Sequence, residues 1–209
     1  MNIIDHLEWR YATKAFDPKK TVSKENMDTL KRALQLTPTS LGLQTFHFHI
    51  IEDNTLKEHL LPYSFNQQQV TQASHLIVLS YYPEVKEKHV DEIIEIKSTL
   101  ESLPKEVLSQ FKEFVMGYIQ RMDKESMAIW SAKQTYIAMG VLLTACAELN
   151  IDACPMEGFD ANGYNEILNL TEKGLHASLV IPVGYRAEDD KYQHMKKVRR
   201  SLQDISTEL

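Results

Sequence analysis

The chain has only two cysteines and lacks long hydrophobic runs, and both absences exclude classes of protein. Cys146 and Cys154 occur neither in a CxxC pair nor in a Cys/His ligand spacing, which argues against a zinc site. No apolar run is long enough to span a bilayer, and the start of the chain has no basic region followed by a long apolar stretch. We therefore expect a cytoplasmic protein with two free thiols and no membrane association.

An excess of positive charge is missing as well. Lysine and arginine total 23 against 29 acidic residues, so the formal net charge is -6. This balance argues against a nucleic acid as the partner. With 209 residues, 43% of them hydrophobic, we expect residues 1–209 to form a single domain with a sizeable core.

Several motifs of common enzyme classes are also absent. The sequence has no GxGxxG, GxxxxGK[ST], GxSxG or HExxH, which removes a Rossmann fingerprint, a P-loop, a nucleophile elbow and a zincin helix. His47 and His49 lie two residues apart, on one face of a predicted strand, and form a candidate metal pair. A third ligand would have to come from a distant segment, so we favour packed, hydrogen-bonded imidazoles.

Hydrophobic periodicity predicts mixed helices and strands. Residues 23–38 have an apolar stripe at helical spacing after Ser23, a good N-cap. The stretches "TFHFHIIE", "HLIVLSYY" and "HASLVIPVGY" are typical of strands. Since strands and helices do not alternate as regular βαβ units, we expect an α+β fold with a small sheet flanked by helices.

Two later segments differ from this pattern. Residues 84–124 are rich in Glu and Lys and predict two amphipathic helices, which together form an excursion from the main body. Residues 126–150 predict one long helix that is nearly apolar from Ile137 to Cys146. Such a helix must be covered on most sides, either inside one domain or by a second subunit.

Basic residues gather near both ends of the chain. Arg10 and Lys14 lie near the start, and "KKVRR" occupies residues 196–200. Each cluster alone is typical of a solvated surface, but together they would suit one phosphate, because guanidinium groups donate paired hydrogen bonds to it. Two weaker signals accompany them. "PMEGF" places Gly158 where backbone can approach a ligand or simply turn, and "TPTSLGLQ" is a polar loop or linker.

Taken in order and spacing, these motifs resemble the FMN-dependent nitroreductase family, in particular the oxygen-insensitive bacterial NAD(P)H nitroreductases that also accept quinones. The matching stretches are "RYATKAFDP", "TPTSLGLQTFHF", "FNQQQVTQASHLIVLS", "WSAKQTYIAMG", "DACPMEGFD" and "IPVGYR". The resemblance covers nearly the whole chain and is weakest in residues 84–124. It implies a nitroreductase-like α+β fold with a small, mostly antiparallel sheet, in an intertwined homodimer that binds two FMN molecules at its interface.

The resemblance also assigns a cofactor site residue by residue. Arg10, Lys197 and Arg199 would hold the FMN phosphate, although the register leaves Arg200 as an alternative to Arg199. Lys14 would lie by the pyrimidine edge of the ring, where a cation stabilises negative charge on the reduced flavin. The full set implied is Arg10, Tyr11, Ala12, Thr13, Lys14, Pro38, Thr39, Ser40, Gly42, Asn66, Gln69, Pro155, Glu157, Gly158, Lys197 and Arg199.

Within this set, residues 38–40 would come from the other subunit, and residues 157–158 would present backbone N–H groups to the flavin. Some positions depart from the family pattern. Tyr11 and Ala12 stand where relatives often carry more polar residues, and Gly42 replaces a common Asn. Gln69 stands where some relatives carry a Lys that helps nicotinamide binding, so the choice between NADH and NADPH stays open.

The implied activity is an FMN-dependent NAD(P)H oxidoreductase that reduces nitroaromatics or quinones, which are small flat aromatic electron acceptors. The implied route is a ping-pong transfer of hydride through flavin N5, with no catalytic side chain. Residues 84–124 would form an active-site lid, with Phe114, Met116 and Tyr118 in the substrate pocket. The alternatives are a flavin reductase or another reductase on the same scaffold, such as a dehalogenase, or a flavin-binding dimer without turnover.

Overall fold

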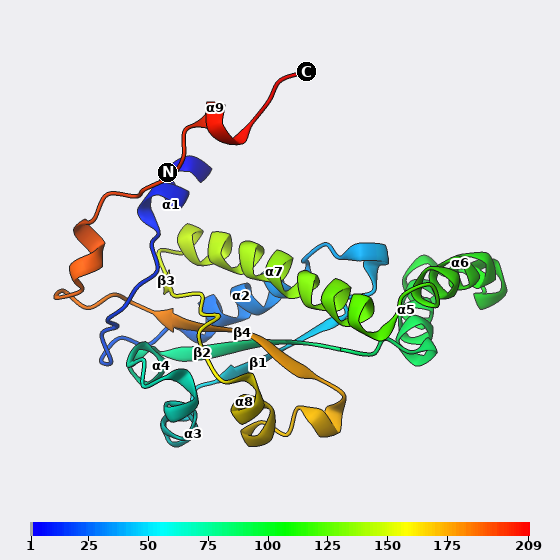
Figure 1. The fold of residues 1–209 in the computed structure, drawn as a ribbon, viewed down its shortest axis with the longest axis horizontal. Helices are drawn as coiled ribbons and strands as arrows, with labels where there is room; N and C mark the ends of the chain where they lie inside the picture. Colours follow the sequence, from blue (N-terminus) through cyan, green and yellow to red (C-terminus); the bar gives the residue numbers. More distant parts are fainter. Residues whose placement is uncertain (1) are drawn as a thin grey trace.

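The computed structural model describes residues 2–209 and has a four-stranded antiparallel sheet at its centre (Figure 1). The strands follow the order β1 (Phe46–Ile51), β2 (His75–Tyr81), β4 (His176–Gly184) and β3 (Asp152–Ala153). Every neighbouring pair is antiparallel. The sheet therefore confirms the small antiparallel sheet that the sequence predicted, and its two outer strands are β1 and β3.

The central strands β2 and β4 are apolar because helices cover both faces of the sheet. Along β2, Leu76 and Val78 point to one face while Ile77 and Leu79 point to the other, and all four are fully buried. Successive side chains on a strand alternate between its faces. An unbroken apolar run is thus what a strand buried on both faces requires.

One face is covered by α2 (Lys24–Gln35) and α7 (Lys124–Glu148). The helix α2 begins where the Ser23 side chain accepts a hydrogen bond from the Asn26 backbone N–H, as an N-cap does. Its apolar stripe packs against β2, β4 and α7. The predicted helix and its cap are confirmed, and the long apolar helix is α7.

The opposite face is covered by α3 (Asn54–Leu60), α4 (Gln69–Gln72) and α8 (Ala161–Ile167) (Figure 1). A hydrogen bond of 2.7 Å between the hydroxyls of Ser64 and Tyr164 joins the turn after α3 to α8 inside the second core. Since both hydroxyls are buried, this pairing satisfies polar groups that would otherwise destabilise the core. The resulting layers are helices, sheet and helices.

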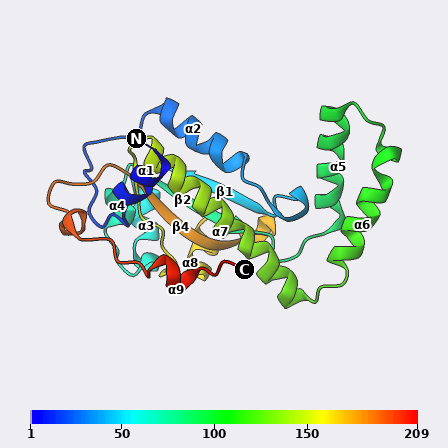
Figure 2. The ribbon, with the colours of Figure 1, turned by 90° about the horizontal axis from the view of Figure 1, so that it is seen from above.

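The excursion consists of α5 (Glu87–Glu101), a short 3-10 turn at Lys105–Leu108 and α6 (Ser109–Ile119). Figure 2 shows the two helices side by side beyond one end of the sheet. Their facing residues, among them Val90 and Val115, form a separate small core. The prediction of two helices in this segment is confirmed. Further short turns are η1 (Ser40–Gly42), η2 (Pro62–Ser64), η4 (Thr171–Lys173) and η5 (Lys191–His194).

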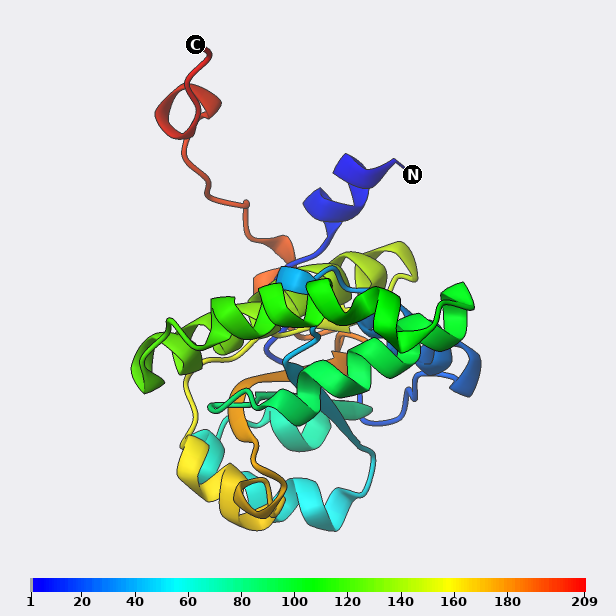
Figure 3. The same cartoon turned by 90° about the vertical axis from the view of Figure 1, so that its right-hand side faces the viewer.

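Helix α1 (Ile3–Trp9) and residues 192–199 of the tail lie near each other at the other end of the sheet. Helix α1, which the sequence analysis did not predict, begins with a capping box between Asn2 and Asp5. It is held against the end of α7 by His6, whose ring nitrogens lie 3.0 Å from the Ala147 carbonyl oxygen and 3.1 Å from a Glu148 carboxylate oxygen. Figure 3 shows the C-terminal tail, with α9 (Leu202–Ile205), leaving the body near α1.

Both cysteines are free, as the sequence predicted, and both are buried. Within residues 2–209, no helix combines the length and apolar composition needed to cross a membrane.

The close packing of α8 on the η2 turn makes Gly163 sensitive to substitution. A Cβ atom at Gly163 would lie 1.9 Å from a ring carbon of Tyr63, whereas one at Gly117 in α6 would meet nothing within 4 Å. We expect G163A to lower the free energy of unfolding by about 1–3 kcal/mol through overpacking. We expect the control G117A to raise it by up to about 1 kcal/mol, because Ala is the better helix former. Urea unfolding measures both, and equal effects would contradict the packing argument.

Candidate functional site

A cavity of about 530 Å³ lies where the start and the tail of the chain meet. It is lined by residues 8–12 and Lys14 from the start, by Pro155 after β3, and by residues 192–193 and 195–199 from the tail. Basic residues from near the two ends of the chain therefore line one cavity.

Three cations crowd together in this cavity. Partial burial, and then the nearby charge of Arg199, lower the pKa of Arg10. Partial burial, followed by the charges of Arg10 and Arg199, likewise lowers the pKa of Lys197, whose ammonium donates to the Arg10 carbonyl oxygen. Within residues 2–209, none of the three forms an ion pair with a carboxylate. The cluster thus carries positive charge that an anion would neutralise.

Asp190 joins the two ends of the chain and was not found from the sequence. It is 2% exposed, and one carboxylate oxygen accepts hydrogen bonds from the Lys14 and Ala15 backbone N–H groups and from the Tyr11 hydroxyl. The other oxygen accepts from the Tyr192 N–H. Burial would raise the pKa of Asp190, but these donors outweigh burial and the pKa lies below its usual value.

A second buried carboxylate, that of Asp152, supports the loop formed by residues 9–13. The Arg186 side chain pairs with buried Asp152, with Nε 2.9 Å from Oδ1. Its guanidinium stacks between the rings of Trp9 and Tyr11, at 4.3 and 4.6 Å from their centroids. Thr13, which is fully buried, donates to the same Asp152 carboxylate. This arrangement holds both aromatic side chains at the cavity wall.

The predicted ring-binding residues occupy the neighbouring surface. The Lys14 ammonium lies 3.4 Å from the Cys154 sulfur, and Ala12 forms a backbone bridge with Ala153. Glu157 and Gly158 are exposed after β3, and the Glu157 carboxylate accepts a hydrogen bond of 2.5 Å from the Tyr136 hydroxyl on α7. That hydrogen bond, followed by burial, raises the pKa of Tyr136 to about 12. The hydroxyl therefore stays protonated and holds the turn in place.

The two predicted residues before β2 differ in their surroundings. Asn66 is exposed in a left-handed conformation with φ of 55°. Gln69 is only 6% exposed, and its amide donates to the side chain of Gln67 at 3.2 Å. Gln69 is also close enough to the Cys154 thiol to oppose the rise of its pKa. The structure thus buries Gln69 near Cys154, whereas Asn66 faces solvent.

The remaining predicted residues lie toward the opposite end of the molecule, near the excursion. Pro38, Thr39, Ser40 and Gly42 surround the η1 turn, where Ser40 N–H donates to Gln134. Phe114, Met116 and Tyr118 lie on α6, and Phe114 is 62% exposed. Figure 2 shows α6 far from α1 and from the tail. Within one chain, the residues predicted to bind the phosphate therefore lie close to Lys14. Residues 38–42 and 114–118 do not lie near them.

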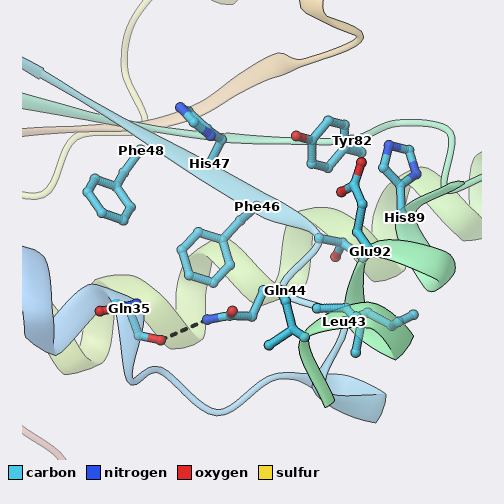
Figure 4. Close-up of a pocket in the computed structure, with 12 residues that line it drawn as sticks. Gln35, Leu43, Gln44, Phe46, His47, Phe48, Tyr82, His89 and Glu92 are labelled. Carbon is cyan, nitrogen blue, oxygen red and sulfur yellow. Dashed lines mark hydrogen bonds between the residues drawn. The ribbon is translucent and has the colours of Figure 1, made fainter. Parts of the chain in front are cut away.

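A second cavity, of about 240 Å³, lies between β1 and α5 (Figure 4). Phe46, His47 and Phe48 contribute to it from β1, while His89 and Glu92 contribute from α5. None of the residues predicted to bind the cofactor lines this cavity in the described chain.

The candidate metal pair lies beside this second cavity. The rings of His47 and His49 are 4.7 Å apart, and His49 shares a hydrogen bond with Ser80. Burial, and then the nearby His47, lower the pKa of His49 to about 4. Within residues 2–209, no group of three His, Cys, Asp or Glu side chains could hold a metal ion. The geometry favours packed, hydrogen-bonded imidazoles.

The cation cluster predicts anion binding by the flavin-free chain. We expect R199Q to weaken binding of inorganic phosphate by about tenfold, because it removes one charge-assisted donor set. R200Q is the matched control, since the Arg200 guanidinium donates to the Asp204 carbonyl oxygen within the tail. Calorimetric titration with phosphate measures both variants, and a larger loss in R200Q would assign the site to the other register.

The low pKa of His49 predicts a dependence of stability on pH. Between pH 6.5 and about 4 the unfolded chain binds a proton at His49 that the folded chain does not, so stability falls as the pH falls through this window. Since His49 is partly accessible, we expect about 1–2 kcal/mol of loss from pH 7 to pH 4.5. Urea midpoints at the two pH values test this, and an unchanged pH dependence in H49Q would contradict it.

Comparison with known proteins gives the family. The sequence profile described as "Nitroreductase family" matches residues 7–185. A Staphylococcus haemolyticus protein named "Putative NAD(P)H nitroreductase" is 37% identical over 211 residues, covering 97% of this chain and 95% of that relative. A Staphylococcus epidermidis protein with the same description is 35% identical, covering 97% of this chain and 94% of the relative.

Solved structures share the fold at lower identity. A crystal structure described as a "putative nitroreductase in complex with FMN", from Exiguobacterium sibiricum, matches with a TM-score of 0.88 at 18% identity, covering 100% of this chain and 98% of that one. A Staphylococcus epidermidis structure described as a "putative NAD(P)H:FMN oxidoreductase" matches with a TM-score of 0.84 at 19% identity, covering 100% and 96%. With its profile match, its relatives and its antiparallel α+β architecture, the chain belongs to the nitroreductase family.

Proposed function

We propose that this protein is an FMN-dependent NAD(P)H oxidoreductase that reduces nitroaromatics or quinones. The observation that carries the proposal is the convergence of Arg10, Lys197 and Arg199 in one cavity without a carboxylate partner among the described residues. The names of relatives point the same way, since they include NAD(P)H nitroreductases and a structure in complex with FMN.

The residues of the cavity fit a flavin phosphate. Mutual repulsion among the three cations is relieved by a dianion, and the guanidinium groups match phosphate oxygens in geometry. The tethers made by Asp190 fix the loop that carries Arg10 and Lys14, so little side-chain or backbone ordering is needed on binding. In this proposal Arg10, Lys197 and Arg199 bind the phosphate, and Tyr11, Ala12 and Thr13 shape the adjoining wall.

The ring would lie over the surface between Lys14 and Gly158. Lys14 supplies a positive charge at one edge of that surface, next to Pro155, while the Glu157–Gly158 turn offers backbone N–H groups at the other. The Tyr136–Glu157 hydrogen bond keeps the turn from collapsing into this space. Bound FMN supplies two-electron hydride chemistry at N5, in a ping-pong cycle that NAD(P)H and the acceptor enter in turn. The chain itself binds, orients and provides charge.

A homodimer would complete the site. Residues 38–42 and the predicted pocket residues of α6 lie toward the opposite end of the molecule from Arg10. A second copy of the chain is therefore needed to bring them to the flavin. The outward face of α7 supports this, because Ile129, Tyr136 and Ile137 are each more than 40% exposed. In this arrangement the partner's α5–α6 excursion forms the lid, with Phe114, Met116 and Tyr118 facing the acceptor.

Anaerobic reduction of the purified protein is the test of this function. We expect a yellow protein that NADH or NADPH bleaches, and that menadione or a nitrofuran then reoxidises, with parallel lines in double-reciprocal plots. R10Q is expected to lose FMN, since its phosphate contact is gone. F114A is expected to change the KM for the acceptor and to leave reduction by NAD(P)H intact.

Each other outcome points elsewhere. Release of reduced FMN without turnover of quinones or nitro compounds would indicate a flavin reductase. A yellow protein that neither nicotinamide bleaches would indicate flavin storage. A colourless protein that ignores added FMN would overturn the proposal.

A further inference from the structure

Cys154 lies directly beneath the cation that the proposed flavin ring would meet. Its sulfur accepts a hydrogen bond from the Lys14 ammonium at 3.4 Å. Burial raises the pKa of the Cys154 thiol, and Lys14, Gln69 and Arg10 oppose that rise. The thiol therefore stays protonated at neutral pH and acts as an acceptor for the Lys14 ammonium.

This contact is the one restraint that the described structure shows on the ammonium of Lys14, which is otherwise an exposed residue. A lysine side chain has a long flexible stem, and Lys14 forms no ion pair with a carboxylate within residues 2–209. The only hydrogen bond of its ammonium in the described structure is the one to sulfur. Without it, the ammonium would turn toward water, where charge is better solvated.

The sulfur itself is rigidly placed. Cys154 is fully buried, directly follows β3, and its backbone N–H donates to the Pro182 carbonyl oxygen at 3.0 Å. The sheet therefore sets the position of the sulfur, and the sulfur sets the position of the ammonium.

The same layer extends to the turn at the other edge of the site. The Gln69 amide donates to Gln67 at 3.2 Å, and the Gln67 amide donates to the Gly158 carbonyl oxygen at 2.7 Å. Gly158 is thus joined to buried Gln69 through Gln67. A substitution of Cys154 would displace the Lys14 ammonium first, because the sulfur and the ammonium are in direct contact.

We propose that Cys154 is a positioning residue, whose sulfur anchors the Lys14 ammonium at the ring edge of the flavin site and thereby raises the reduction potential of the bound flavin. The inference rests on the proposed function, and it assigns a role to a residue that the sequence motifs marked only as a free thiol. An anchored cation stabilises the negative charge of reduced flavin more than a mobile cation does, because it is already in place and needs no reorganisation when the charge forms.

The test compares C154A, C154S and C146A. Cys146 is the matched control, because it is equally buried and forms no hydrogen bond through its sulfur in the described structure. We expect C154A to weaken the preference for reduced over oxidised FMN by about tenfold, which is about 30 mV for a two-electron couple. C154S should restore part of the shift, since its hydroxyl also accepts a hydrogen bond. C146A should leave the potential unchanged.

Crystal structures of flavin-free wild type and C154A test the anchor separately. We expect the Lys14 ammonium at the sulfur in the wild type and turned to solvent in C154A. Equal potentials in C154A and C146A, or an unmoved Lys14, would overturn the inference while FMN binding and turnover still supported the proposed function. Failure of the wild-type protein to bind FMN would overturn the proposed function. The crystal structures would then still show whether Cys154 holds the Lys14 ammonium.

Discussion

The hydrogen bonds of Asp190 are the constraint on which the candidate site depends. They connect the loop after α1 to the segment that leads into the C-terminal tail, so residues separated by most of the chain become neighbours. Without such a tether, three cations would have no reason to gather, because like charges repel. A single buried carboxylate, held by neutral N–H and O–H donors, thus brings the two basic segments together and leaves their positive charge facing the cavity.

Much of the fold could be predicted because its signals are local. The Ser23 cap, the apolar stripe of α2 and the unbroken apolar run of β2 each depend on residues close in sequence. The two helices of the excursion follow from amphipathic spacing interrupted by proline. Helix α1 escaped prediction because its seven residues give little periodicity, and its stability comes from the capping box and from His6 at the end of α7.

The candidate site was predictable only in its charges. Arg10, Lys14 and the basic tail residues can be recognised in the sequence as basic residues. The resemblance to a family assigned them to one cofactor site. Asp190, Cys154 and Gln67 act through contacts between segments far apart in sequence, so no local pattern marks them. The geometry favours Arg199 over Arg200 as the phosphate ligand, since Arg199 lines the cavity and Arg200 donates to the Asp204 carbonyl oxygen in the tail.

The uncompensated charge of the cavity has a consequence for the tail beyond it. Residues 195–209 pack little against the body, with Met195, Val198 and Leu202 all more than 60% exposed. Lys197 is the contact that holds this segment to the loop after α1, through the Arg10 carbonyl oxygen. An anion that binds Arg10, Lys197 and Arg199 only in the folded chain would add to that attachment by mass action, so occupancy of the cavity would make this polar tail less accessible to proteases.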